Sequence, residues 1–202
     1  TSPSLPDGRD ATRFSCPRCG NFVLTRTLIA TLPGILASAT DAAAKLSHAL
    51  RRAQELNSEV LFSTATIEAV LRRPLPRPRE QADLLIRWLA LNLPGPGELV
   101  DLSPKTHAGI VGAKSDSGFA LVLDHLFAID LLTGHQLKTI GAQGNAKATL
   151  SFRGWTYYED LAKGSIAYRK AFMAMKFGDS VLEQILSNAF KPAAKLAGFD
   201  LF

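Results

Sequence analysis

Residues 16–20, CPRCG, constrain the fold of this sequence more than any other short segment. Two thiols three positions apart with a glycine directly after them are typical of the tight turn of a zinc ribbon, where Gly20 permits a close backbone path around the metal. Residues 13–27 are accordingly predicted to form a knuckle followed by a short strand. Cys16 and Cys19 are the candidate metal ligands, and zinc is the expected metal.

The CPRCG knuckle supplies two ligands, whereas a structural zinc site is almost always four-coordinate. We therefore expect a second ligand pair, another CxxC, in sequence that precedes Thr1. Two alternatives remain. A redox dithiol is one, although such a pair normally opens a helix after a strand. A vestigial knuckle held by hydrogen bonds alone is the other.

Composition describes a packed globular protein. The chain has 202 residues, of which 47% are hydrophobic, and no stretch approaches the roughly 18 apolar residues of a membrane span. Its polar start carries no signal-peptide pattern, so a reducing cytoplasm is the expected compartment and no membrane partner is expected. The net charge of +5 is spread evenly along the chain, which makes it weak evidence for nucleic-acid binding.

Three helices are predicted in the first half of the chain, over residues 40–56, 64–73 and 79–92. The first has Thr40 as its expected N-cap and an apolar stripe at helical spacing. That stripe comprises Leu46, Ala49, Leu50, Ala53 and Leu56. The proline-rich segment 72–78 ends the second helix, and LPGPG at 93–97 ends the third.

Residues 104–163 have the element order of a winged helix. A short helix near 105–112 precedes a stronger helix over 117–130, two short strands near 131–140 and 147–151, and a last helix. The buried face of the stronger helix is predicted to carry Phe119, Val122, Leu123, Leu126 and Ile129.

Residues 170–202 read as a β-α-β unit. KAFMAMKF resembles a strand buried on both faces, GDS a turn with Asp179 as helix cap, and FDLF a second strand. The helix between them is expected to turn Val181, Leu182, Ile185, Leu186, Ala189 and Phe190 inward. Pro192 should kink it or end its first section, and Gly198 should close it. A parallel sheet needs more strands than two, so we expect the sheet to continue beyond this sequence or to be completed by a partner.

The predicted fold class is mostly α with small β parts, that is, α+β. A helical and winged-helix-like region precedes the first β-α-β unit of a flavodoxin-like parallel sheet. The expected domains are a zinc-ribbon-like knuckle (1–30), a helical region (31–100), a winged-helix-like region (101–168) and the start of a nucleotide-handling domain (169–202).

The segment RKAFMAMKFGDSVLEQILSNAFKPAAKLAGFDLF resembles the opening of a bacterial family with the pattern A-F-V-A-M-x-F, a helix with a K-P step, and A-G-[FY]. This is the TIR-like and nucleoside 2-deoxyribosyltransferase-like group. The resemblance implies a flavodoxin-like domain that binds a nucleoside or NAD-type nucleotide and can cleave its N-glycosidic bond. It implies nucleotide binding by Met175, Phe177, Gly178 and Asp179. The family's catalytic glutamate belongs to a later helix absent here, so catalytic residues are unknown and activity cannot be inferred.

Three functions follow as hypotheses. The first is the sensor or assembly part of a nucleotide-binding or nucleotide-cleaving effector in bacterial defence or stress response. The second is a winged-helix regulator that binds nucleic acid, with Arg51, Arg52, Arg72 and Arg73 as candidate phosphate contacts; the absence of interleaved aromatics disfavours it. The third is a scaffold that self-associates into a homo-oligomer.

Overall fold

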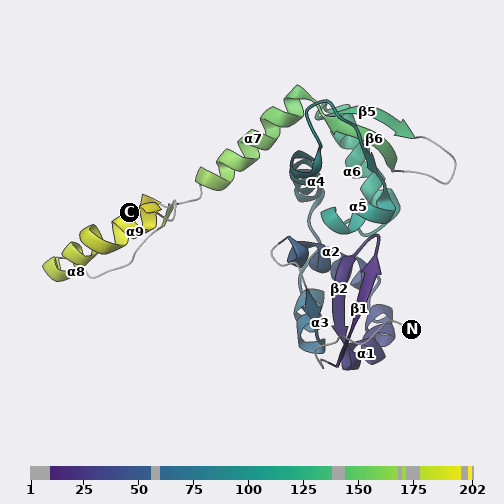
Figure 1. The fold of residues 1–202 in the computed structure, drawn as a ribbon, viewed down its shortest axis with the longest axis horizontal. Helices are drawn as coiled ribbons and strands as arrows, with labels where there is room; N and C mark the ends of the chain where they lie inside the picture. The colour runs from purple at the N-terminus through teal and green to yellow at the C-terminus, as the bar shows by residue number, and fades with distance from the viewer. Residues whose placement is uncertain are drawn as a thin grey trace. The chain divides into compact units, whose positions relative to one another are not determined.

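The computed structural model describes residues 10–55, 60–137, 144–167, 170–171, 178–196 and 200–201. The chain divides into two compact units, Thr1–Trp155 and Thr156–Phe202, and each is described here by itself. Helices predominate and the sheets are small (Figure 1), which confirms the predicted α+β class. Among the described residues, no helix combines the length and the apolar character that crossing a bilayer requires.

The first part of the first unit is a three-stranded sheet with three helices. Strands β1 and β2 form an antiparallel hairpin, and β3 pairs in parallel with β2, so the sheet joins segments on both sides of the predicted boundary at residue 30. The elements are β1 (Ala11–Cys16), β2 (Gly20–Thr25), α1 (Arg26–Ala37), α2 (Ala42–Gln54), β3 (Leu61–Phe62) and α3 (Thr64–Leu71).

One apolar cluster holds this part together. Leu28 from α1, Leu50 from α2, Phe62 from β3 and Ile67 from α3 are all buried in it. The hydroxyl of Thr25 accepts a hydrogen bond from the Leu28 amide and so caps α1. The helical pattern of the sequence did not identify α1, because the segment contains Pro33 and buries a single residue.

Helix α2 confirms the helix predicted over 40–56 but begins differently. Its N-cap is Asp41, which makes no side-chain capping bond, and the expected cap Thr40 instead accepts a hydrogen bond from Lys114. Leu46 and Leu50 are buried as predicted, whereas Ala49 and Ala53 are only partly buried against the same cluster. Leu56 lies outside the described residues.

The second part of the first unit has the element order of a winged helix. A helix, a strand, two helices and a β-hairpin follow one another, and the antiparallel sheet has the order β4-β6-β5. The elements are α4 (Pro78–Asn92), β4 (Val100–Leu102), α5 (Pro104–Val111), α6 (Asp116–Ala128), β5 (Leu132–Leu137) and β6 (Asn145–Leu150). The structure therefore adds β4 to the predicted order of helix, helix and hairpin.

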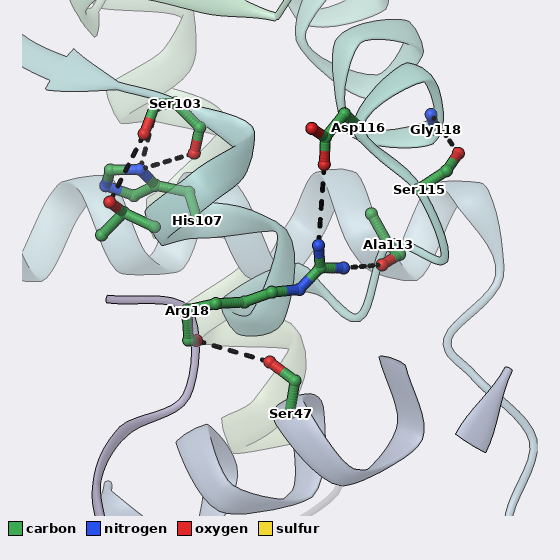
Figure 2. Close-up of polar contacts among 9 residues, drawn as sticks. Arg18, Ser47, Ser103, His107, Ala113, Ser115, Asp116 and Gly118 are labelled. Atoms are coloured by element: carbon green, nitrogen blue, oxygen red, sulfur yellow. Dashed lines mark hydrogen bonds and ion pairs between the residues drawn. The ribbon is translucent and has the colours of Figure 1, made fainter. Parts of the chain in front are cut away.

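Helix α6 packs as its sequence predicts. Phe119, Val122, Leu123 and Leu126 are buried, while Ile129 is half-buried at the C-cap. The Ser115 hydroxyl accepts a hydrogen bond from the Gly118 amide and caps this helix (Figure 2). Helix α5 lies against α6 as well as α2 and α4, so it connects the two parts of the unit.

The second unit contains a small parallel β-α-β arrangement. Strands β7 and β8 pair in parallel, with Lys170 opposite Asp200. Most of the predicted first strand and the predicted closing residue Gly198 lie outside the described residues. The elements are the end of α7 (Phe152–Ala167), β7 (Lys170–Ala171), α8 (Ser180–Ile185), the π-helical turn η1 (Leu186–Phe190), α9 (Lys191–Leu196) and β8 (Asp200–Leu201).

The predicted inward face of the helix in the second unit is wrong for this chain. Leu186 is half-buried, but the other five residues of that face are exposed, because no element among the described residues covers them. The exposed residues are Val181, Leu182, Ile185, Ala189 and Phe190. The disturbance expected at Pro192 takes the form of the π-helical turn directly before α9. Proline has no amide hydrogen for the carbonyl four residues earlier, and a widened turn accommodates this loss.

Gly112 and Gly97 offer a matched test of the contact between the α5 cap and its surroundings. Both have positive φ, 74° and 85°, so alanine at either position costs about 1–2 kcal/mol of backbone strain. At Gly112 an added Cβ would also lie 2.7 Å from Pro76 Cδ and 3.1 Å from His48 Cγ, whereas at Gly97 it meets nothing within 4 Å. Urea denaturation should show Gly112→Ala to be less stable than Gly97→Ala by about 1–3 kcal/mol. Equal losses would show that the cap is not tightly packed.

Candidate metal-binding knuckle

The two cysteines lie at the tip of the β1–β2 hairpin. Cys16 ends β1, Cys19 ends the three-residue turn, and Gly20 begins β2 with a φ of 78°. Cys16 and Gly20 are partners in the strand register. Both thiols are free and half-buried. The predicted knuckle therefore exists as a closed turn that brings both sulfurs to one end of the hairpin.

The two thiols have different acidities. Partial burial raises the pKa of Cys16, but the backbone N–H groups of Cys19 and Arg18, the Cys19 thiol and the Arg51 charge together bring it below the usual value. Burial raises the pKa of Cys19, and a hydrogen bond with Ser47 offsets this only in part. Cys16 is therefore the first of the two thiols to lose its proton as the pH rises.

Side chains from α2 fix the turn by binding its carbonyl groups. Arg51 donates from Nη2 to the Pro17 oxygen and from Nε to the Arg18 oxygen, the latter at 2.9 Å. Gln54 donates from Nε2 to the Cys19 oxygen at 2.7 Å. These hydrogen bonds hold the turn that carries both sulfurs.

The turn also contacts the second part of the unit. Arg18 donates from Nη2 to the Ala113 oxygen at 2.9 Å and forms an ion pair with Asp116 at 3.6 Å (Figure 2). The Ser47 hydroxyl donates to the Arg18 oxygen at 3.4 Å. At Gly109 of α5, an added Cβ would overlap this carbonyl and the Ser47 hydroxyl. The knuckle is therefore enclosed between α2 and the segment that runs from α5 to α6.

The arrangement suits a metal ligand pair but supplies half of a site. Metal ligands must be deprotonated, and the hydrogen bonds at Cys16 favour its thiolate. Within the part of the chain that the structure describes, no group of three or more His, Cys, Asp or Glu side chains could hold an ion. His48, whose Nδ1 lies 3.0 Å from the Gly109 oxygen, does not join the two cysteines in such a group. The described residues thus offer a zinc ion two thiolate ligands, Cys16 and Cys19.

The four arginines predicted as phosphate contacts have different positions. Arg51 binds the turn, and Arg52 forms an exposed ion pair with Glu55. Arg72 is the exposed C-cap of α3, and Arg73 follows it. The four therefore do not act as one patch. Ser47, Arg51 and Gln54 of α2, which bind the turn carbonyls, are called the α2 clamp below. The clamp was not predicted, although its residues have the i, i+4, i+7 spacing of one helix face.

Two of the four predicted nucleotide-binding residues belong to the described chain. Gly178 has a φ of 75°, and Asp179 is the N-cap of α8 as predicted. The Asp179 carboxylate accepts hydrogen bonds from the amides of Val181 and Leu182 at 3.2 and 3.3 Å. Met175 and Phe177 lie outside the described residues.

Comparison with known proteins gave no relative. No family model, no curated protein and no solved structure matches the chain significantly.

The neighbouring arginines on α2 provide a test of the clamp. Arg51→Met removes two charge-assisted hydrogen bonds to the turn and should lower the free energy of unfolding by about 2–3 kcal/mol. Arg52→Met removes an exposed ion pair and should cost about 0.5 kcal/mol or less. Chemical denaturation measures both. Similar losses in the two variants would contradict the clamp.

Differential alkylation tests the thiol acidities. In chelator-treated protein, iodoacetamide should modify Cys16 before Cys19, because its pKa is lowered while that of Cys19 is raised. As the pH rises from about 6 to about 9, the Cys16 rate should rise first, since the thiolate is the nucleophile. Peptide mapping by mass spectrometry identifies the site. Faster modification of Cys19 at any pH in this range would refute the assignment.

Proposed function

We propose that this chain is the sensor or assembly part of a protein that binds or cleaves a nucleotide at an N-glycosidic bond. In this proposal the first unit makes protein contacts and the second unit handles the nucleotide. The two free thiols suit a reducing compartment, so we place the protein in the cytoplasm.

The exposed face of α6 is the observation that supports protein binding as the role of the first unit. In a helix-turn-helix arrangement the second helix of the pair enters the DNA major groove, and α6 occupies that position. Its sequence, Asp116–Ala128, contains no Lys or Arg. Leu121 is 66% exposed, and Asp124 is exposed beside it along the helix. Such a helix lacks the phosphate attraction and guanine contacts of a DNA reader, whereas an apolar and acidic surface suits a protein partner.

The parallel pairing of β7 with β8 supports the second unit's proposed role. Parallel strands joined through a helix are the building block of folds that bind ligands at the carboxyl ends of their strands. Asp179 stands at the start of α8 and already fills the N-terminal amide positions with its own carboxylate. An anion is therefore disfavoured there. A ribose hydroxyl or a positively charged base is a better match for this carboxylate.

Nucleoside binding at Asp179 can be tested with two substitutions that remove its charge and keep a capping side chain. Asp179→Ser keeps only a capping oxygen, and Asp179→Asn also keeps the shape of the side chain. Ligand-observed NMR with adenosine and NAD should detect binding to the unaltered chain and weaker binding to both variants. Glu183→Gln, one turn into α8, is the control and should bind as the unaltered chain does.

The same mixtures, followed by chromatography, should show no base release from adenosine or NAD, because cleavage needs a carboxylate placed against the ribose and Glu183, one turn into α8, is exposed. Absence of nucleoside binding by the unaltered chain, or equal binding by all variants, would refute the proposal.

The nucleic-acid alternative predicts a different outcome. If α6 read DNA, fluorescence anisotropy on mixed duplexes would give a sub-micromolar dissociation constant at physiological salt. We expect binding weaker than about 10 µM, the range of non-specific association, because α6 carries no cation.

A further inference from the structure

A cavity of about 780 Å³ lies in the first unit, away from the knuckle turn. Helix α2, strand β3, helix α3 and the proline-rich segment before α4 form its walls. Pockets that bind small organic ligands measure about 300–1,000 Å³. The space is therefore of the right size for a ligand as large as a mononucleotide.

The interior of this cavity is apolar. Ala49 and Ala53 of α2, Val60 and Phe62 at β3, and Val70 of α3 line it, and all five belong to the apolar cluster of this part or pack against it. A ligand that enters it needs an apolar body, because a fully hydrated ion gains nothing from such walls.

The charged groups at the cavity are mainly positive. Lys45, Arg52 and Arg73 line it, against one carboxylate, Glu80. Glu80 is already engaged, since its Oε2 accepts a hydrogen bond from the Arg77 amide at 2.7 Å and caps α4. The lining therefore carries an excess of two positive charges, before the carboxylates bonded to these cations are considered.

Two of the three cations have partners. Lys45 pairs with Asp41 at 3.1 Å and donates to the Leu71 oxygen at 3.0 Å, and Arg52 pairs with Glu55. The Arg73 guanidinium makes no hydrogen bond or ion pair with any residue in the described ranges. Among the described residues, Arg73 is therefore the cavity cation that has no bonded partner and can bind an anion.

His48 adds a neutral polar group to the same wall. A carbonyl can only accept, so Nδ1 donates its proton to the Gly109 oxygen. Burial, and then the Arg52 charge, lower the pKa of His48 and keep the ring neutral near pH 7. Its Nε2 is consequently a hydrogen-bond acceptor, suited to a ligand N–H or O–H group.

The geometry points to a binding site for a small organic phosphate with an apolar body, of mononucleotide size. Arg73 would hold the phosphate at the rim, and the apolar walls would cover the body. A guanidinium favours phosphate because its fork of N–H donors matches two phosphate oxygens. This site belongs to the first unit and does not depend on Asp179.

Adjacent arginines again provide the matched control. Isothermal titration with AMP, adenosine and inorganic phosphate should give the tightest binding for AMP, with each of the others about tenfold weaker or more, because each supplies half of the contacts. Arg73→Gln should weaken AMP binding by about tenfold, whereas Arg72→Gln, next to it but absent from the cavity lining, should not.

A cavity-filling variant tests the apolar part. Ala69 is exposed and lines the cavity, so Ala69→Trp should obstruct the space without entering the core. Its melting temperature should stay near that of the unaltered chain while AMP affinity falls.

Asp179→Ser distinguishes this site from the one proposed in the second unit. AMP affinity that falls in Arg73→Gln and persists in Asp179→Ser supports the cavity site. The proposal would be overturned by the absence of AMP binding up to about 10 mM or by equal AMP affinities of Arg72→Gln and Arg73→Gln. It would also be overturned if AMP affinity fell in Asp179→Ser alone.

Discussion

The hydrogen bonds from α2 to the carbonyl groups of residues 17–19 are the interaction on which the first unit depends. A hairpin turn exposes its carbonyls to water, and here Arg51, Ser47 and Gln54 replace that water. The same turn sends Arg18 to Ala113 and Asp116, so the hairpin, α2 and the α5–α6 segment form one connected network. A metal at Cys16 and Cys19 would add to a turn that these hydrogen bonds already hold.

This network also separates two roles that adjacent residues play on α2. Arg51 points to the turn, while Arg52 lies at the cavity on another side of the same helix. Consecutive helical residues are about 100° apart, so one helix serves both places. A change at either position should therefore affect one place with little effect on the other.

The long helices were predictable from sequence because their apolar residues repeat at helical spacing. Helix α6 is the clearest case, with Phe119, Val122, Leu123 and Leu126 on its buried face. Strands β3 and β4 have only two and three residues, so no alternation pattern can reveal them, and their existence depends on pairing with β2 and β6. The cysteine turn followed from the CPRCG motif.

The features that could not be predicted depend on tertiary structure. The sequence positions of Arg51, Arg52, Arg72 and Arg73 do not show which arginine binds the turn and which lines the cavity. These roles depend on where Pro17 and Val60 lie in space. The inward face expected for α8 assumed a larger sheet than the described β7 and β8 provide. The periodicity correctly indicates which residues share a helix face but carries no information on what covers it.

The π-helical turn at Leu186–Phe190 has a consequence for how sequence changes propagate in the second unit. A π-turn accommodates one residue more than the α-helical turn it replaces, so it is the structural equivalent of a single-residue insertion. Such an insertion rotates everything downstream by about 100° around the axis. Lys191 and Lys195 therefore face a direction that an uninterrupted helix would give to their neighbours. Losing one residue from this turn would restore a regular helix and leave both lysines on the side that they face now, because the widened turn already takes up the extra residue.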